Sequence, residues 1–279
     1  MPIKRYKPTT PGRRGASVQD FSDVTKKRPE KSLTTFLKER AGRSKQTGKI
    51  TVRHRGAGVK RLYRMVDFLQ KKFDMPGTVQ AIEYDPNRGP RIALIQFPDG
   101  KKQYVLAPAS LKVEDVIVSS ASALPITAGN RMPLAFIPIG TTVHSVEFQP
   151  GLGGKLVRGA GDGAQVMSTE GSHVQLKLPS GERRLFPKEC SASVGAVGNP
   201  DFRLVRLGKA GRKRHLGWRP VVTGKAMNPV DHPHGGGEGH QPIGLKRGPM
   251  TKWGKRARGV KTRKAHRASD KLILERRRK

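Results

Sequence analysis

Thr78-Val-Gln-Ala-Ile-Glu-Tyr84 and Arg91-Ile-Ala-Leu-Ile-Gln-Phe97 are two short runs with the composition of β-strands, separated by a turn that contains Pro and Gly. Pro98-Asp-Gly100 predicts a second turn into a strand over 101–106, and residues 112–118 predict a fourth strand. Together these segments predict a small β domain.

A second β-rich region follows a linker of small residues at 119–129. We expect short strands at 144–148 and 165–168. Residues 173–178 alternate apolar and polar side chains with period two, and the chain returns after a Gly-containing turn as a strand over 182–186. Because the region shows no helical periodicity, we predict two small all-β barrels or sandwiches with a boundary near residue 125.

Charge is concentrated at both ends of the chain. The 279 residues include 56 Lys and Arg and 21 Asp and Glu, a net charge of +35. Residues 1–64 carry +15 and residues 201–279 carry +18, whereas residues 65–200 carry only +2. Apart from a short helix over 32–40 and a strand over 271–275, the flanks predict no regular structure. We therefore expect them to become ordered on a polyanion.

RNA is the polyanion that the sequence favours. The Gly- and Pro-rich flanks form no amphipathic helix for a membrane, and no DNA-binding helix motif or zinc finger is present. Small β barrels and arginine-rich segments are common in RNA-binding proteins. With one cysteine, Cys190, no secretory signal and an apolar stretch at 132–143 that Pro and Gly interrupt, we predict a soluble intracellular protein without membrane contact.

Two basic segments combine glycine with an aromatic residue. Residues 56–64 contain Tyr63, and residues 208–220 contain Trp218. Glycine lets the backbone pass close to phosphates, and an aromatic ring can stack on an unpaired base or pack locally. These segments are candidate RNA contacts.

The stretch Ala226-Met-Asn-Pro-Val-Asp-His-Pro-His-Gly-Gly-Gly-Glu-Gly239 resembles the signature of the ribosomal protein L2 family, the universal second protein of the large ribosomal subunit. Further segments match in order along nearly the whole chain: 25–33, 82–88, 178–182, 195–199, 208–212, 253–254 and 269–273. Residue 240 and the segment 241–249 depart from the family pattern, as do residues 56–59.

The resemblance implies an OB-like barrel followed by an SH3-like barrel, flanked by long basic irregular extensions. We assign the N-terminal extension to 1–64, the OB-like RNA-binding barrel to 65–125, the SH3-like barrel to 126–200 and the C-terminal extension to 201–279. It also implies a structural, primary rRNA-binding protein near the peptidyl-transfer centre. Such a protein supports subunit association, tRNA binding and peptide-bond formation, contacts small-subunit rRNA and lies among neighbouring ribosomal proteins.

The rRNA contacts predicted on this basis are basic, aromatic or hydrogen-bonding residues of the flanks, together with one arginine in the first-barrel turn. They are Arg13, Arg14, Arg53, Arg55, Lys60, Arg61, Arg64, Arg88, Lys209, Arg212, Lys213, Arg214, Trp218, Arg219, Lys225, Asn228, His232, His234, Lys255, Arg256, Arg258, Lys261 and Arg263.

One loop also permits a chemical role. Asp231, His232, His234, Glu238 and His240 lie within ten residues, and imidazole and carboxylate groups can bind zinc or transfer protons. We favour hydrogen bonding to RNA, because Pro and Gly make this loop a poor rigid platform. We thus predict no enzyme, no metal and no cofactor, with His232 as the candidate if a catalytic residue exists. The alternatives are an RNA-processing enzyme that uses the 231–240 cluster and a general nucleic-acid chaperone.

The remaining glycine loops and the cysteine carry no predicted chemistry. Residues 151–154 and 159–163 lack the lysine and helix of a phosphate-binding loop, so we interpret them as turns. Cys190, which precedes a short apolar strand, is interpreted as a core thiol.

Overall fold

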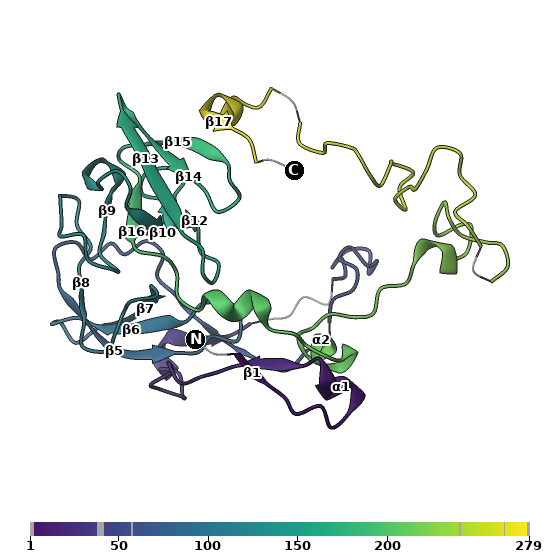
Figure 1. The fold of residues 1–279 in the computed structure, drawn as a ribbon, viewed down its shortest axis with the longest axis horizontal. Coiled ribbons are helices and arrows are strands. Elements are labelled where there is room, and N and C mark those ends of the chain that lie inside the picture. The colour runs from purple at the N-terminus through teal and green to yellow at the C-terminus, as the bar shows by residue number, and fades with distance from the viewer. Residues whose placement is uncertain (1–2, 38–41, 57, 240, 265, 278–279) are drawn as a thin grey trace. The chain divides into compact units, whose positions relative to one another are not determined.

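Short antiparallel strands dominate the chain (Figure 1), which confirms the predicted mainly β fold class. The computed structural model describes residues 3–37, 42–56, 58–239, 241–264 and 266–277. The strands there are β1 (Ile3–Arg5), β2 (Ser17–Gln19), β3 (Thr34–Phe36), β4 (Leu62–Arg64), β5 (Gly77–Glu83), β6 (Ile92–Gln96), β7 (Lys102–Leu106), β8 (Val116–Ile117), β9 (Arg131–Pro133), β10 (Thr142–His144), β11 (Val146–Glu147), β12 (Gly154–Leu156), β13 (Ala164–Glu170), β14 (His173–Lys177), β15 (Arg183–Pro187), β16 (Ser191–Val194) and β17 (Ile273–Glu275).

Helices in the described residues are few and short. The α-helices are α1 (Pro11–Arg14) and α2 (Ala210–His215), and the 3-10 helices are η1 (Lys31–Leu33), η2 (Leu134–Phe136), η3 (Pro200–Leu204), η4 (Gly224–Ala226) and η5 (Ala268–Leu272). None of them is long and apolar enough to cross a membrane.

The chain divides into two units. The first unit comprises residues 1–38, 60–210 and 269–279, and contains both large sheets. The second unit comprises residues 39–59 and 211–268, and so combines parts of both basic flanks. It contains 21 lysines and arginines but only three acidic residues, so it holds a large share of the positive charge.

The first sheet has the strand order β7-β6-β5-β8, and it contains the four strands predicted between residues 78 and 118. β8 is shorter than predicted, because residues 112–115 form a turn. The Asp115 carboxylate accepts the backbone N–H of Lys112 at 2.7 Å, and Glu114 has a φ of +75°, which a strand does not allow.

The strand β6 accounts for the continuous apolar run at residues 92–95. Ala93 and Ile95 belong to one buried cluster, while Ile92 and Leu94 belong to another that includes Tyr104. A strand that is covered on both faces requires apolar residues at consecutive positions, so this strand does not alternate.

Part of the N-terminal flank covers the second face of the first sheet. From its composition alone, this flank was predicted to have no regular structure of its own. The buried guanidinium of Arg91 pairs with Asp23 at 2.7 Å. The hydroxyl of Tyr104 donates to Glu83 at 2.7 Å and accepts the backbone N–H of Glu30 at 2.8 Å. The flank is therefore held on the barrel by buried polar groups of the barrel.

The helix predicted over 32–40 is wrong within the described residues. After the single turn of η1, residues 34–36 form β3, which pairs with β4. Thr34 and Thr35 are β-branched and favour a strand once a partner strand is available. Residues 38–40 of that prediction lie outside the described part of the chain.

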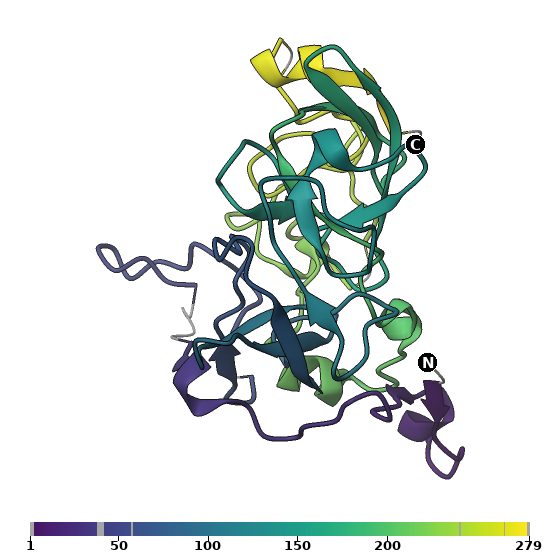
Figure 2. The same cartoon turned by 90° about the vertical axis from the view of Figure 1, so that its left-hand side faces the viewer.

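The second sheet has the order β17-β15-β14-β13-β10-β16-β9, around a core that includes Val143, Leu176 and Phe186. The strands predicted at 165–168, 173–178 and 182–186 are present as β13, β14 and β15. The strand predicted over 144–148 is instead split into β10 and β11 at Ser145, whose φ is +48°. Figures 1 and 2 both show the yellow C-terminal strand β17 beside the hairpin of this sheet, where it pairs with β15.

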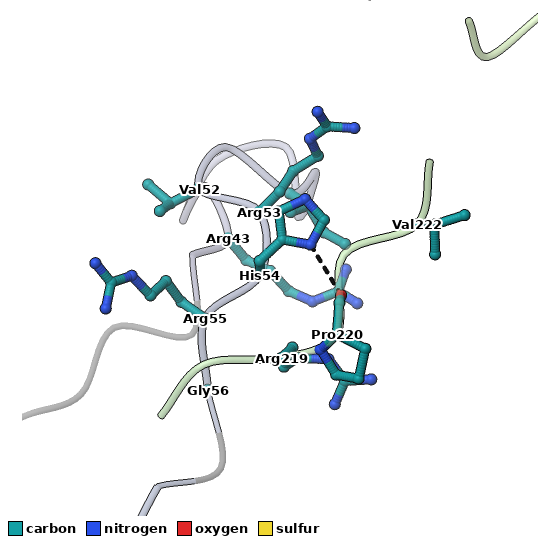
Figure 3. Close-up of a pocket in the computed structure, with 10 residues that line it drawn as sticks. Arg43, Val52, Arg53, His54, Arg55, Gly56, Arg219, Pro220 and Val222 are labelled. Carbon is teal, nitrogen blue, oxygen red and sulfur yellow. Dashed lines mark hydrogen bonds between the residues drawn. The ribbon is translucent and has the colours of Figure 1, made fainter. Parts of the chain in front are cut away.

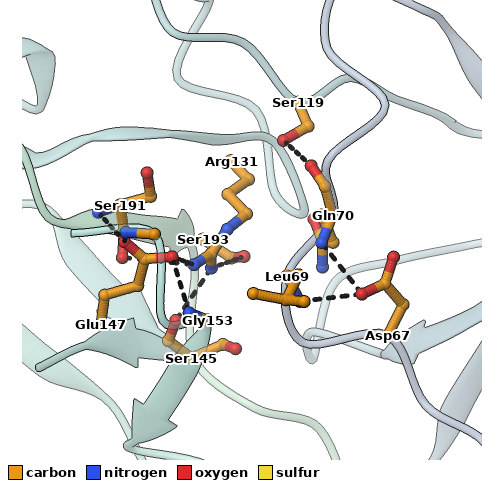
Figure 4. Close-up of polar contacts among 11 residues, drawn as sticks. Asp67, Leu69, Gln70, Ser119, Arg131, Ser145, Glu147, Gly153, Ser191 and Ser193 are labelled. Atoms are coloured by element: carbon orange, nitrogen blue, oxygen red, sulfur yellow. Dashed lines mark hydrogen bonds and ion pairs between the residues drawn. The ribbon is translucent and has the colours of Figure 1, made fainter. Parts of the chain in front are cut away.

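A buried ion pair crosses the core of this sheet (Figure 4). Arg131 Nη2 lies 3.0 Å from Glu147 Oε1, and the Arg131 guanidinium also donates to the carbonyl of Ser145 at 2.9 Å. Glu147 accepts three backbone N–H groups, from Gly151, Gly153 and Ser191, each at 3.1 Å. The carboxylate thus organises the glycine loop at 151–154, which forms a turn between β11 and β12 as predicted.

Cys190 is a fully buried free thiol that directly precedes β16. Burial and the negative charges of Glu147 and Glu189 raise the pKa of this thiol to about 12. It stays protonated at neutral pH, as a core thiol should.

Candidate nucleic-acid interface

Two basic segments from opposite flanks pair side by side in the second unit. Residues 54–56, 58 and 59 lie beside residues 215–219, and backbone hydrogen bonds join the two segments from Gly56 N to Gly217 O at 3.0 Å and from Arg219 N to His54 O at 3.1 Å. A Cβ on Gly58 would lie 3.0 Å from the backbone of Gly217, so the close approach of the two segments leaves little room for a side chain here. We call these paired segments the basic ladder.

Side chains reinforce the basic ladder across its two segments. The Arg55 guanidinium carbon lies 3.4 Å from the centre of the Trp218 ring, in a cation–π contact. Arg214 Nη1 donates to the carbonyl of Gly56 at 3.1 Å. The Nδ1 of His54 lies 3.1 Å from the carbonyl of Pro220, so this nitrogen carries the proton and donates.

A cavity of about 600 Å³ opens on the same ladder (Figure 3). Four arginines, one histidine and three aliphatic side chains account for most of its wall, and no carboxylate lines it. The lining residues are Arg43, Ile50, Val52, Arg53, His54, Arg55, Gly56, Arg219, Pro220 and Val222. The cavity is therefore cationic and partly apolar.

The predicted histidine loop forms a hydrogen-bonded cluster within the second unit. His232 Nδ1 accepts the backbone N–H of His234 at 3.0 Å, and His234 Nε2 accepts the backbone N–H of Met250 at 2.8 Å. The two rings lie 4.7 Å apart. Gly224 packs against the His232 ring so closely that a Cβ would lie 2.4 Å from its Cε1. The loop is thus more ordered than its Pro and Gly content indicated.

These bonds limit the chemistry of the loop. A neutral imidazole has one lone pair, and in His232 the N–H of His234 occupies it. Partial desolvation, the nearby His234 ring and the charge of Arg53 lower the pKa of His232, which disfavours the imidazolium. Protonation of His232 at Nδ1 would therefore require the release of this hydrogen bond, and the lowered pKa disfavours the imidazolium that would form.

No metal centre is formed by the residues that the structure describes, since no three His, Cys, Asp or Glu side chains among them could hold an ion. His240, the fifth member of the suggested cluster, lies outside the described residues.

Some predicted contacts make bonds within the first unit. Arg64 is buried and donates to the carbonyl of Leu62 at 2.9 Å. Arg88 lies 2.9 Å from Asp85 and donates to the hydroxyl of Tyr63 at 3.0 Å. Arg61 donates to the carbonyl of Pro86 at 3.2 Å. The others in this unit, Arg13, Arg14, Lys60 and Lys209, are exposed.

The remaining predicted contacts belong to the second unit. Arg212 and Lys213 lie on α2, Lys225 lies on η4, and Asn228 accepts the backbone N–H of Asp231 at 3.0 Å through its own carbonyl. A basic turn follows, in which Met250 bridges to Arg256. Five exposed cations belong to this turn and its continuation: Lys255, Arg256, Arg258, Lys261 and Arg263.

Sequence reasoning missed five residues of the cavity, namely Arg43, Ile50, Val52, His54 and Val222. The only sequence signal was the run Arg53-His54-Arg55 beside a glycine. Nothing in the sequence indicates that residues 43–56 meet residues 219–222.

Comparison with protein-family models gives two matches. Residues 30–119 match the model described as Ribosomal Proteins L2, RNA binding N-terminal domain. Residues 127–254 match the model described as Ribosomal Proteins L2, C-terminal domain. Together the two models cover most of the chain, including the first large sheet, the second large sheet apart from β17, and the basic ladder.

Proposed function

Because the chain belongs to the ribosomal protein L2 family, and is thus an rRNA-binding structural protein of the large ribosomal subunit, we propose that it holds rRNA through the basic ladder and the basic turn of its second unit. The observation that carries this proposal is the pairing of the two segments of the basic ladder. It places cations from both flanks on one small scaffold, so that they meet the same stretch of RNA.

All the predicted rRNA contacts stay part of this proposal, but they contribute in two different ways. Exposed cations such as Arg53, Arg219 and Lys255 are available for phosphates, because no carboxylate of the described residues pairs with them. Arg64 and Arg88, which bond to the first unit, act by shaping the surface around β4. We also propose 65–125 and 126–200 as the two barrels, each centred on one of the large sheets.

The family resemblance extends the proposal to the ribosome. According to this proposal, the protein lies in cytoplasmic ribosomes near the peptidyl-transfer centre. There it supports subunit association, tRNA binding and peptide-bond formation. It contacts small-subunit rRNA and neighbouring ribosomal proteins, and performs no catalysis of its own. The occupied lone pair of His232 supports this non-enzymatic role.

A binding experiment tests the proposal. The full chain should bind transcribed large-subunit rRNA more tightly than an unrelated RNA of equal length, with a steep loss of affinity as salt increases. Equal affinity for both RNAs would favour the nucleic-acid chaperone. Cleavage of RNA by the pure protein, with or without divalent metal, would favour the RNA-processing enzyme and contradict the proposal.

A further inference from the structure

The cavity on the basic ladder has an apolar wall that phosphate binding does not require. Ile50, Val52 and Val222 line it with 55%, 54% and 54% of their surface exposed. A surface that only neutralises phosphates needs cations and hydrogen-bond donors. Three aliphatic side chains left uncovered beside arginines indicate that the ligand also has an apolar face.

The charge of the wall indicates an anion. Arg43, Arg53, Arg55 and Arg219 line the cavity with His54, and no acidic residue lines it. Arg43 donates to the carbonyl of Gly48 at 3.0 Å and Arg55 contacts Trp218. Arg53 and Arg219 make no ion pair with a carboxylate of the described residues, so their guanidinium groups are open to an anionic ligand.

The size of the cavity restricts the ligand further. Its volume of about 600 Å³ lies within the range of sites that enclose one small organic group. An RNA double helix keeps its bases stacked inside, and the major groove of the A-form is too narrow for side chains to read. A base can reach this cavity only when it is unpaired and turned out of the helix.

We propose that the cavity binds a single unpaired nucleotide of the RNA, with its base against Ile50, Val52 and Val222 and its phosphate on Arg53 and Arg219. This inference rests on the proposed function, because the nucleotide is part of rRNA. It adds that the basic ladder contacts a base as well as the phosphate backbone, and so selects an RNA site where a nucleotide is extruded.

The test compares two pairs of valines in the full chain. Val52→Ala with Val222→Ala reduces the apolar wall and leaves every charge in place. Val221→Ala with Val230→Ala is the matched control, because these valines are 67% and 97% exposed and do not line the cavity. Ile50→Ser changes a third part of the wall independently.

Binding to transcribed large-subunit rRNA should weaken about threefold to thirtyfold in the Val52/Val222 variant, as expected for lost contact between methyl groups and a base. Ile50→Ser should weaken binding in the same direction, and the control should bind as the wild type does. The dependence of log affinity on log salt should not change, because no phosphate contact is removed. A Val52/Val222 variant that binds like its control, or that loses affinity through a shallower salt dependence, would overturn the proposal.

Ultraviolet crosslinking gives a second result, because it joins bases to the side chains that touch them. Mass spectrometry should place a crosslinked nucleotide within residues 50–55 or 219–222 of the wild type, and less of it in the Val52/Val222 variant. No crosslink there would contradict the pocket. Adenosine monophosphate that crosslinks at the same residues and binds as tightly as the whole rRNA would assign the cavity to a free nucleotide and also overturn the proposal.

The proposed function is assessed separately in the same samples. Preference of the wild type for rRNA over an unrelated RNA measures that function. The ratio between the RNA affinities of the two valine variants measures how much the cavity contributes to binding. This ratio can be determined with either RNA. The proposed function can therefore fail while the nucleotide pocket is confirmed, and the reverse is also possible.

Discussion

The guanidinium of Arg55 lies over the Trp218 ring at 3.4 Å, and the same two residues form a backbone bridge between the segments of the basic ladder. One residue comes from the N-terminal flank and the other from the C-terminal flank. Their contact joins the two chain segments of the second unit beside the cavity, which Arg55 also lines.

Arg55→Lys should loosen this contact, because an ammonium group keeps the charge but does not stack on the indole. A cation–π contact contributes about 0.5–2 kcal/mol. The chain has two tryptophans, so a Trp253→Phe background leaves Trp218 as the only indole fluorophore. In that background, acrylamide should quench Trp218 more strongly after Arg55→Lys. Arg53→Lys makes the same chemical change at a neighbouring arginine and should leave quenching unchanged; equal quenching in both variants would contradict the contact.

The five cations of the basic turn should account for part of the salt dependence. Replacing all of them with Gln removes up to five phosphate contacts, and each contact contributes about 0.7–0.9 to the slope of log affinity against log salt. We expect a shallower slope in filter binding to rRNA. The residues changed are Lys255, Arg256, Arg258, Lys261 and Arg263.

A variant with the same loss of charge in the first unit provides the control. The control changes five of its exposed lysines, which lie on and between its strands, to Gln, and this should alter the slope less. An equal slope in both variants would mean that the second unit has no special part in RNA binding. The control residues are Lys71, Lys101, Lys112, Lys155 and Lys177.

Most strands could be predicted from the sequence because each depends on local information. The alternation in residues 173–178 and the turns at Gly100 and Gly181, with φ of +75° and +84°, are fixed by nearby residues. The fold differs from the prediction where the structure of a segment depends on a partner that is distant in the sequence. Residues 34–36 became a strand because β4 pairs with them, and residues 19–30 became ordered because Arg91 and Tyr104 bind them.

The sequence indicated which residues belong to the candidate site, but not that the two segments carrying them pair. Arg53, Arg55 and Trp218 were recognised as cations and an aromatic beside glycine. Their pairing depends on backbone hydrogen bonds between segments that lie far apart in the sequence, and no periodicity encodes it. Charge also could not distinguish Arg53, which is exposed, from Arg64, which is buried.

The ion pair of Arg131 and Glu147 should be needed for the stability of the second sheet. Arg131→Met leaves a buried carboxylate with no countercharge, and breaking a buried pair in this way costs about 3–5 kcal/mol. Glu147→Leu should cost at least as much, because it also removes the acceptor of three backbone N–H groups. Urea unfolding of the full chain, followed by near-ultraviolet circular dichroism, measures both.

The double variant separates the two contributions. If the charge pair dominates, Arg131→Met with Glu147→Leu should be less destabilised than the sum of the single variants. Strict additivity would show that the two side chains act independently, in spite of their contact at 3.0 Å.

His144 should make the second sheet sensitive to acid. Its Nδ1 donates to the carbonyl of Gly195 at 2.8 Å, and burial lowers the pKa of this histidine to about 4. The unfolded chain, with a pKa near 6.5, takes up the proton first as the pH falls. Stability is therefore complete above pH 6.5 and decreases towards pH 4, by about 3 kcal/mol.

His144→Asn tests this titration. Asparagine keeps an N–H donor near Nδ1 but does not titrate, so the variant should lose less stability than the wild type between pH 6.5 and pH 4. Urea unfolding at both pH values measures the difference. The same loss in both proteins would assign the acid sensitivity to other groups.

His232 should not act as a catalyst in peptide-bond formation. Its lone pair accepts the N–H of His234, and its pKa is lowered, so proton uptake at Nδ1 would require the release of this hydrogen bond. General acid–base catalysis contributes about 10²–10⁴-fold. Ribosomes that carry His232→Gln should therefore form peptide bonds within about tenfold of the normal rate. The measurement is single-turnover, on particles shown to contain the protein, so that poor assembly is not mistaken for slow chemistry.

His232→Asn distinguishes structure from chemistry at the same position. Its side-chain oxygen can replace Nδ1 as the acceptor for His234, whereas the oxygen of the longer Gln side chain reaches beyond that position. We expect the Asn variant to enter ribosomes more completely than the Gln variant, and both to react at similar rates once assembled. A loss of a hundredfold or more in the chemical step, in fully assembled particles of both variants, would show that the imidazole itself takes part in the reaction and that the hydrogen bond to His234 must open during the cycle.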